Sequence, residues 1–484
     1  MSTEANHTGS RPREFLYSIN FRQPMHITFT RLASPGVLVI ILFMAPIRHV
    51  TAQWNVTPQS VELLSPGPVS GITEMSGVTF LGSTGSNHHF AAVQDSGNQL
   101  ALFDVIFTND GSISSATATG DVSLAPGFDF EGIAFTNPSR NSVYISEETT
   151  PTVREYDLSS GNMLQVLSMP AVFEHIRGNR GLESLTRTVG GTVMWTANEE
   201  SLTVDGPAAT TTSGTVVRLQ QLLVDDDSVV PAAQYAYDVS PVHDVGFAGQ
   251  QQSGLTDLVA LPDGTVLTLE RSFAALASPT YLGRIYQIDF SSATDISQLP
   301  LTASLAGQIF TPVDKQLLAS FVVGSSGENL EGLTLGPRLA NGHWTLLGVV
   351  DDGGPFSNNT VASFEISPPS CISASDINCS GTVDEFDYMA WKDTFSSTSL
   401  LFADVSHNGT VDAADYTLWR ADSAANPANE SSIPEPGPHV LFLIGCAFFA
   451  LIIGQPDRFL GRFTCCLTPK LVSGTAQRSL QRPV

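Results

Sequence analysis

Lysine is nearly absent from this chain, and basic residues of either kind are few. The 484 residues include 22 lysines and arginines against 47 aspartates and glutamates, for a formal net charge of −25. A nucleic-acid-binding surface needs clustered lysine and arginine side chains facing the phosphate backbone, so we expect no nucleic-acid partner. An acidic chain rich in Gly, Ser, Thr and Asp is typical of an exported, β-rich protein that binds calcium.

Cysteine is also scarce. The chain has five cysteines, and none lies between Ala52 and Ser370. A large domain in that range has no disulfide framework and is held together by core burial alone. Cys371 and Cys379 follow it. They can pair in an oxidising compartment or stay reduced, and the sequence leaves both states open.

Long apolar runs are limited to two segments, one near each end. GVLVIILFMAP (Gly36–Pro46) follows two arginines and precedes the small-x-small site Val50–Ala52. This order is typical of a secretory signal, so we expect residues 1–52 to be a signal region cut near Ala52. Met25 is an alternative start, and an uncleaved membrane helix is an alternative interpretation, although the run is short for spanning a bilayer.

The second run is VLFLIGCAFFALIIG (Val440–Gly454), preceded by Pro434-Glu435-Pro436 and followed by arginines. This arrangement resembles the PEP-CTERM sorting tail of bacterial surface proteins. The resemblance implies a removable membrane anchor over 439–484 and a location in the cell envelope. The Pro- and Ser-containing residues 425–438 before it are expected to form a linker. The chain departs from the pattern by continuing for more than twenty residues past Arg458. A plain C-terminal transmembrane helix is the alternative and gives the same topology.

Between these segments, over residues 53–368, one phrase recurs at intervals of roughly 50 to 75 residues. A polar or acidic residue is followed by a small residue and then by apolar ones. The copies, laid in register, are Ser76–Phe80, Glu131–Phe135, Glu183–Thr186, Asp257–Leu261 and Glu331–Leu335.

Each phrase is followed by two further strand patterns. The second pattern ends in acid: HFAAVQD, SVYISEE, TVMWTANEE, TVLTLER and HWTLLGVVDD. The third shows period-two alternation: NQLALFDV, PTVREYDL, GTVVRLQQL, GRIYQIDF and NTVASFEI. Units of three or four antiparallel strands cannot bury their faces alone, so we predict a mostly β fold, a β-propeller of five or six blades. A sixth blade would lie around 205–250 or 290–325.

Four of these segments also carry a family resemblance. FEGIAF, GLESLT, GLTDLVALPDGTVLTLERS and ENLEGLTL, in that order, resemble the phytase-like family, also called the esterase-like domain of phytase. The resemblance covers about residues 70–367. It implies a propeller with activity on phosphate or other esters.

In a propeller the innermost strand of each blade begins at the central channel, so acids at its start crowd one mouth. The candidates are Glu131, Glu183, Asp257 and Glu331, and the second choices are Glu147, Glu199, Glu270 and Asp351. Converging carboxylates raise one another's pKa unless a cation compensates, and Ca²⁺ is the expected cofactor. Bound calcium activates water and neutralises phosphate charge. The same acids can instead tie blades together through arginines or backbone amides.

Arg177, Arg180 and Arg271 lie beside these phrases and are the candidates for clamping an anionic substrate. The absence of a Gly-x-Ser-x-Gly elbow argues against a serine esterase of the α/β-hydrolase type. Since residues 53–368 hold a single lysine, Lys315, a highly phosphorylated substrate such as inositol hexakisphosphate is not expected.

Residues 369–424 contain two twelve-residue acidic loops with glycine at position 6. The predicted metal ligands are Asp376, Asn378, Ser380, Thr382, Asp384 and Asp387 in the first loop, and Asp404, Ser406, Asn408, Thr410, Asp412 and Asp415 in the second. Oxygen ligands at alternate positions around a sharp glycine turn suit a wrapped Ca²⁺ ion. A short helix pattern, DYMAWK or DYTLWR, follows each loop.

The tandem resembles the dockerin type I repeat, whose closing ligand is Asp. That resemblance implies a small EF-hand-like calcium module and a cohesin-like protein partner. A calcium-stiffened stalk between the propeller and the membrane is the alternative.

These features leave three functional hypotheses open. The first is a calcium-dependent hydrolase of phosphate or other esters that uses the channel carboxylates. The second is a non-catalytic surface scaffold or adhesin that binds protein or glycan partners. The third is a lactonase or similar metal-dependent hydrolase.

Overall fold

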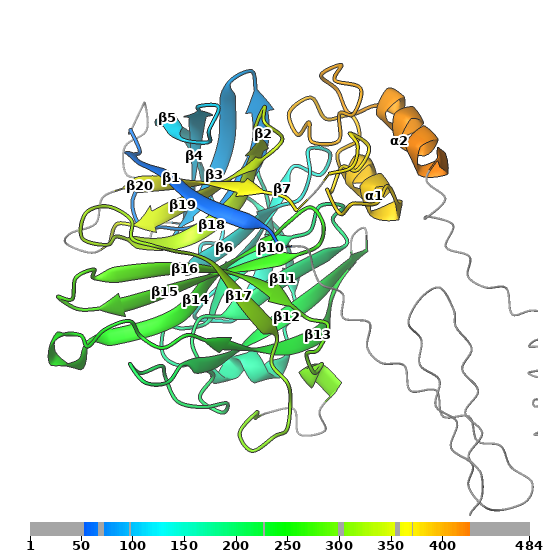
Figure 1. Ribbon diagram of the computed structural model, residues 1–484. Helices are drawn as coiled ribbons and strands as arrows, with labels where there is room; N and C mark the ends of the chain where they lie inside the picture. Colours follow the sequence, from blue (N-terminus) through cyan, green and yellow to red (C-terminus); the bar gives the residue numbers. More distant parts are fainter. Residues whose placement is uncertain are drawn as a thin grey trace, which may run out of the picture. The chain divides into compact units, whose positions relative to one another are not determined.

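The structure is a computed structural model that describes residues 53–65, 72–95, 98–225, 228–298, 304–353, 359–369 and 371–425. Twenty strands over these residues form five four-stranded antiparallel sheets, each of them a blade (Figure 1). The prediction of a mostly β propeller is confirmed, and the described residues make five blades.

The blades follow one another along the chain. The first holds β2 (Met75–Thr84), β3 (Asn87–Gln94), β4 (Gln99–Phe107) and β5 (Ile113–Ser123). The second holds β6 (Phe130–Phe135), β7 (Ser142–Glu147), β8 (Thr152–Asp157) and β9 (Met163–Leu167). The third holds β10 (Leu182–Arg187), β11 (Val193–Asn198), β12 (Thr215–Asp225) and β13 (Ser228–Val239). The fourth holds β14 (Gln251–Ala260), β15 (Val266–Ala274), β16 (Tyr281–Asp289) and β17 (Asp314–Phe321). Three short 3-10 helices lie at Ala171–His175, Phe247–Gly249 and Ile296–Gln298.

The fifth blade closes the ring. It combines β18 (Asn329–Arg338), β19 (Trp344–Asp351) and β20 (Thr360–Ser367) with β1 (Asn55–Leu63) from the start of the described chain. β1 pairs with β20 from Asn55 opposite Ser367 to Leu63 opposite Thr360, and Figure 1 shows the blue strand beside the yellow one. The inner strands contact one another in the cyclic order β2, β6, β10, β14, β18 and back to β2. This pairing ties the two ends of the propeller sequence together and leaves no gap in the ring.

The alternative of a sixth blade around 205–250 or 290–325 is wrong for the described residues. Those stretches hold β13 and β17, the fourth strands of the third and fourth blades. Long connections precede β12 (residues 199–214) and β17 (residues 290–313), and this extra length explains the wider spacing of the repeats there.

The apolar core lies between blades. Five clusters of buried residues each combine side chains of two neighbouring blades. One of them joins Phe90 of β3 to Val349 of β19. Another joins Leu219 of β12 to Val266 of β15. A blade therefore cannot bury its faces without its neighbours, as the repeat pattern indicates.

Glycine allows the inner strands to approach closely. A Cβ atom on Gly132 of β6 would lie 2.3 Å from the backbone nitrogen of Leu185 on β10. A Cβ atom on Gly332 of β18 would lie 2.5 Å from the carbonyl oxygen of Ser76 on β2. Any larger side chain would force the neighbouring backbones apart, as the small residues in the phrases predict.

Residues 371–425 form a small module with two α-helices, α1 (Glu385–Asp393) and α2 (Ala413–Ala425). Each helix includes the last three residues of an acidic loop. Trp391 and Trp419 make reciprocal bonds: each indole Nε1 donates to the carbonyl of the other repeat, at Asp412 (2.8 Å) and Asp384 (3.1 Å). A disulfide joins Cys371 to Cys379.

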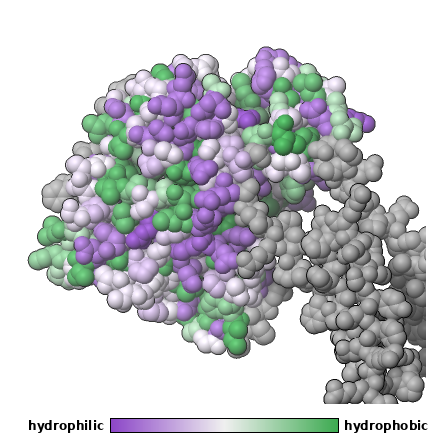
Figure 2. Space-filling view, viewed as in Figure 1, coloured by the Kyte–Doolittle hydropathy of each residue, from purple (hydrophilic) through white to green (hydrophobic). Residues whose placement is uncertain are grey.

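The predicted signal region, linker, sorting tail and transmembrane helix lie in residues 1–52 and 426–484, outside the described residues. Within the described ranges, no helix combines the length and apolar character that a membrane crossing requires. Figure 2 shows hydrophilic and hydrophobic residues interspersed over the face of the described residues that it displays.

Candidate functional site

The repeated acids lie at a shared irregularity near the start of each inner strand. The pairing of β6 with β7 slips between Phe130 and Ile133, that of β10 with β11 between Leu182 and Ser184, and that of β18 with β19 between Leu330 and Gly332. Glu131, Glu183 and Glu331 lie inside these slips. A bulge adds a residue to one strand and changes the direction of its side chain, which here brings carboxylates from separate blades to one mouth.

A pocket of about 300 Å³ occupies this mouth. Its charged lining consists of the six carboxylates of Asp95, Glu131, Glu148, Glu183, Glu331 and Asp351 and the two guanidinium groups of Arg180 and Arg271. Asn179, Gln252, Phe273, Tyr281 and Asn329 complete the wall. The carboxylates outnumber the cations, so the pocket has excess negative charge.

Three of these acids meet closely. Glu131, Glu148 and Glu183 each offer a carboxylate oxygen, and the three oxygens lie within 4.8 Å of one another. All three residues are buried, and Oε2 of Glu148 is inaccessible and has no hydrogen-bond partner. Burial, followed by repulsion from nearby carboxylates, raises the pKa of Glu131 and Glu183 well above the usual value. Burial also raises the pKa of Glu148, which shares a hydrogen bond with Glu183. A divalent cation would replace that shared proton and satisfy the lone oxygen.

A second group of acids adjoins the first. Asp95 and Asp129 each have an oxygen within 4.8 Å of an oxygen of Glu131. Burial and a hydrogen bond to Asp129 raise the pKa of Asp95 to about 7. Ser76 of β2 donates its hydroxyl to Glu131 from the position that a carboxylate occupies in the second, third and fifth blades.

The two pocket arginines have different surroundings. The guanidinium of Arg271 donates to Glu199 at 2.5 Å and to Asn329 at 3.0 Å, and it also pairs with Glu331. Its side chain is 10% exposed. Arg180 donates to Glu199 at 3.0 Å, and its side chain is 34% exposed. Burial raises the pKa of Glu331 to about 8, although Arg271 opposes the shift.

Two candidates lie elsewhere. Arg177 does not line the pocket; its guanidinium donates to the carbonyl oxygens of Ser201 (3.2 Å) and Gly206. The alignment of Asp257 with the glutamates is wrong by one residue. The register of β14 slips between Leu255 and Asp257, which places Thr256 in the bulge instead.

A shift of one residue turns a strand side chain to the opposite face, so Asp257 points away from the pocket. Its carboxylate accepts from the backbone N–H groups of Leu258 (2.8 Å) and Leu333 (2.6 Å). Burial raises its pKa well above the usual value, and these amide bonds limit the increase. Asp257 therefore ties β14 to β18 and is not part of the acid cluster.

The second-choice acids divide in the same way. Asp351 lines the pocket. Glu199 does not line it but forms ion pairs with both pocket arginines, Arg180 and Arg271. Glu147 pairs with Arg154 at 2.6 Å, and Glu270 pairs with Lys315 at 2.5 Å; neither lines the pocket.

Sequence reasoning missed Asp95, Asp129 and Glu148 as site residues. Asp95 and Glu148 are the acids that directly follow the second strands β3 and β7. Their position at the end of a second strand is the sequence feature that could have identified them as site residues. Glu147 and Glu148 are neighbours, and successive side chains of a strand point to opposite faces. Which of the two carboxylates faces the channel therefore depends on the exact end of β7, which the sequence does not reveal.

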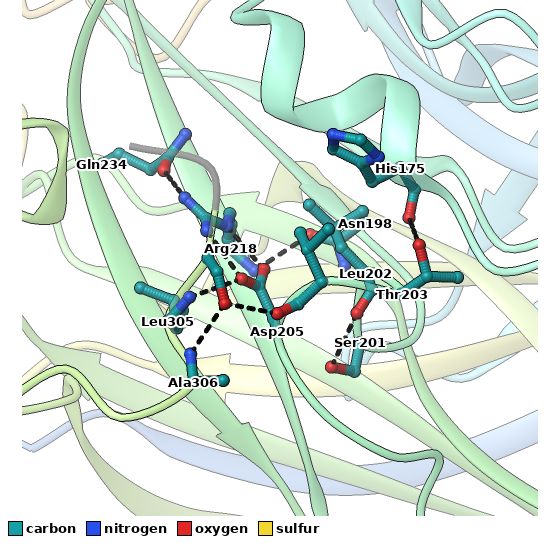
Figure 3. A network of polar contacts seen from close by, with 12 residues as sticks. His175, Asn198, Ser201, Leu202, Thr203, Asp205, Arg218, Gln234, Leu305 and Ala306 are labelled. Atoms are coloured by element: carbon teal, nitrogen blue, oxygen red, sulfur yellow. Dashed lines mark hydrogen bonds and ion pairs between the residues drawn. The ribbon is translucent and has the colours of Figure 1, made fainter. Parts of the chain in front are cut away.

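A buried network holds the segment that follows Glu199 (Figure 3). The guanidinium of Arg218 on β12 donates to both carboxylate oxygens of Asp205, at 2.6 and 2.7 Å, and to Gln234 at 2.7 Å. Asp205 also accepts from the backbone N–H of Leu305 at 2.8 Å. Asp205 is thus bonded to the third blade through Arg218 and to the fourth blade through Leu305. These bonds also fix the connection between β11 and β12, in which Glu199 lies.

The two acidic loops of the module have matching backbone hydrogen bonds. The side chain of Asp387 accepts from the N–H of Asn378 (3.0 Å) and of Asp384 (2.8 Å), and Asp415 repeats this with Ser406 and Asp412. Asp376 and Asp404 each accept from the N–H of the loop glycine.

The first loop also contains an unsatisfied oxygen. Asp376 is fully buried, and its Oδ1 has no hydrogen-bond partner. A cation would supply the missing partner, so the residues of this loop fit one. Neither loop is among the groups of three acidic ligand atoms within 4.8 Å that the described residues contain.

The sequence matches one protein-family model, described as "Phytase-like: Esterase-like activity of phytase", over residues 70–354. This range spans more than half of the chain and all of the pocket residues. No curated protein matches the sequence significantly.

Several solved structures resemble the fold distantly. They include a luciferin-regenerating enzyme (12% identity, 64% of this chain and 95% of that chain, TM-score 0.32) and Myxococcus xanthus glutaminyl cyclase (13%, 64% and 95%, TM-score 0.29). A mannose phosphorylase from Leishmania mexicana is similar at 11% identity, with 64% and 90% covered and a TM-score of 0.31. Likenesses at these scores support no conclusion about this chain.

Proposed function

We propose, from the premise that this chain belongs to the phytase-like family, that it is a divalent-cation-dependent hydrolase of phosphate or other esters. The catalytic centre is the acid mouth of the channel. The observation that carries this proposal is the group of Glu131, Glu148 and Glu183, because it combines three buried carboxylates with one oxygen that has no partner. Buried carboxylate oxygens in purely structural contacts usually have a hydrogen-bond partner, so this oxygen supports a cation site.

Glu131, Glu148 and Glu183 would hold the cation, and Ca²⁺ suits an all-oxygen set of this kind. A bound cation supplies Lewis acidity and an activated water. The protein's own residues do the rest: burial of the triad makes its ionisation unfavourable unless a cation is bound, and Ser76 orients Glu131.

Arg180 is the residue that would orient the anionic group of the substrate. It lines the pocket, is one-third exposed and has a hydrogen bond to Glu199. Arg271 is nearly buried and pairs with two carboxylates, so it is a positioning residue for Glu331. One exposed guanidinium favours a substrate with a single phosphate or carboxylate over a polyphosphate.

The direct test is hydrolysis of 4-nitrophenyl phosphate and 4-nitrophenyl acetate by the purified chain, with calcium or with a chelator. Glu148→Gln removes a ligand and preserves shape, so we expect calcium affinity to fall by at least the roughly 10- to 100-fold that loss of an outer-shell partner costs, and turnover to fall with it. Glu365→Gln is the matched control, since Glu365 binds His343 and Asn341 outside the pocket. Equal turnover by Glu148→Gln and the unchanged chain would reject the proposal.

The alternative function is a non-catalytic surface scaffold or adhesin. Asp257 favours it, because this acid from the same repeat binds backbone amides and holds strands together. Calcium bound in the channel without hydrolysis of either ester would support the scaffold.

We also propose that both module loops bind Ca²⁺, with the lone oxygen of Asp376 as support for the first loop. Export, anchoring through residues 439–484 and a cohesin-like partner are further parts of the proposal, argued from the sequence. Mass spectrometry of the mature N-terminus tests the first of these: a start near Gln53 is expected, and an intact residue 1 would reject cleavage.

A further inference from the structure

The opposite mouth of the channel, where the inner strands end, faces the calcium-loop module. A cavity of about 520 Å³ lies there. Its wall combines strand-end residues such as Thr186, Ala260 and Pro337 with module residues such as Thr394 and Phe402. The two parts also belong to one compact unit.

A buried ion pair joins them. Arg187, the last residue of β10, donates to both carboxylate oxygens of Asp393, the last residue of α1, at 2.8 Å each. The side chains are 11% and 12% exposed. Asn137 donates to the same carboxylate at 3.2 Å. A two-point pair this well shielded is both strong and directional.

A second cation reaches the first calcium loop. Arg338, the last residue of β18, has Nη2 3.4 Å from the sulfur of Cys371 and 3.7 Å from that of Cys379. Cys379 lies inside the loop between Asp376 and Asp387.

Close backbone contact completes the interface. The N–H of Ser83 donates to the carbonyl of Ser399 at 2.9 Å. A Cβ atom on Gly190 would lie 2.9 Å from Cβ of Met389 on α1. Phe402 packs against both the module core and the cluster between the fourth and fifth blades. Charge, hydrogen bonding and apolar packing therefore all contribute.

We propose that the module is an intramolecular partner of the propeller, docked through α1 and its first loop, and that Ca²⁺ binding in that loop strengthens the contact. The loop leads directly into α1: Asp384 caps the helix, Asp387 lies in its first turn and Asp393 ends it. A cation bound by Asp376 and Asp387 would fix the start of α1. The last residue of this helix, Asp393, forms the ion pair with Arg187. The contact face of α1 is then unavailable to a second protein, and an outside partner must use the α2 side.

Hydrogen exchange of the full chain, with Ca²⁺ or with a chelator, tests this coupling. The amide of Gly381 reports on the loop, that of Ser83 on the interface and that of Ala92 on the propeller core. Calcium should slow exchange at Gly381 and at Ser83 by about tenfold or more, and any change at Ala92 reports separately on a cation bound in the channel.

Three variants separate the steps. Asp376→Asn should abolish the calcium effect at both Gly381 and Ser83, without disturbing cations bound in the channel. Arg187→Gln should keep the effect at Gly381 and lose it at Ser83. Arg284→Gln is the matched control, because its side chain is 14% exposed and it contacts only propeller residues.

Calcium protection of Gly381 with no change at Ser83 in the unchanged chain would overturn the coupling. No protection at Gly381 would overturn the cation part. Docking itself is tested by a double-mutant cycle of Arg187→Gln and Asp393→Asn, in which the two effects on the unfolding constant should be non-additive by about tenfold. Additive effects would overturn it.

Discussion

The two ends of the inner strands differ in how their polar groups are satisfied. At the start, Glu131, Glu148 and Glu183 crowd one another and leave an oxygen without a partner. Near the end, Thr79 accepts from the N–H of Phe135 at 3.0 Å, and Thr186 from that of Ala260 at 2.9 Å. One set of strands therefore carries unfavourable charge at one mouth and neutral cross-blade bonds at the other. Departures from local consistency of this kind mark functional sites.

The largest expected effect on stability comes from Arg271→Ala. Its removal leaves Glu199 and Glu331 buried without this cation, so we expect a loss of about 3–5 kcal/mol in the free energy of unfolding. Urea unfolding measures it. Arg180→Ala is the control, because its side chain is one-third exposed and should cost about 1 kcal/mol or less. Equal losses would show that the difference in burial does not determine how much each arginine contributes to stability.

Gly132→Ala tests close packing at the acid mouth. The new Cβ would lie 2.3 Å from the nitrogen of Leu185 and 2.4 Å from the carbonyl carbon of Ser184, and backbone must move. We expect a loss of about 3 kcal/mol. Gly120→Ala on β5 is the control, since its Cβ would meet only Leu102 at 3.9 Å. A stable Gly132→Ala variant would contradict the close approach.

The acid mouth should also make stability depend on pH when no cation is bound. Burial raises the pKa of Glu331 to about 8 and that of Asp95 to about 7. The folded chain holds these protons more tightly than the unfolded chain. Their stabilising contribution is therefore present below about pH 4 and is lost as the pH rises through 7 to 8.

In chelator we expect the free energy of unfolding to fall on the order of 2 kcal/mol between about pH 5 and pH 9. Added Ca²⁺ should reduce this fall, and Glu331→Gln should reduce it in chelator. A free energy that rises over this range would contradict the assignment.

The smallest effect is expected at the opposite mouth. Thr186→Val removes the acceptor of the Ala260 N–H and should cost about 1 kcal/mol. The loss should be the same with calcium or chelator and at each pH, because no charge is involved. A calcium-dependent loss would show that a bound cation, in the channel or in the module, acts on this mouth.

Much of the fold was predictable from local pattern. The phrases at Glu131, Glu183 and Glu331 mark inner strands, since alternation and turn residues are local properties. The fourth strands of the third and fourth blades were not predictable: long connections over residues 199–214 and 290–313 interrupt these blades, so the stretches around them resemble part of another blade. The family resemblance rests on the same phrases.

The site was predictable only in part. Glu131, Glu183 and Glu331 do line the pocket, but Asp257 does not, because a bulge shifts its register by one residue. Asp129 lies just before its inner strand, where no pattern distinguishes it from an ordinary turn acid. The pairing of Arg187 with Asp393 joins residues far apart in sequence and has no local signal.

The sequence alone determined the repeat, the strand periodicity, the acidity and the order of the parts, because these are properties of neighbouring residues. Only the tertiary structure decided which acids meet, where the register slips and that the module contacts the propeller. Those outcomes depend on closure of the ring, because closure brings together side chains that are far apart in the sequence.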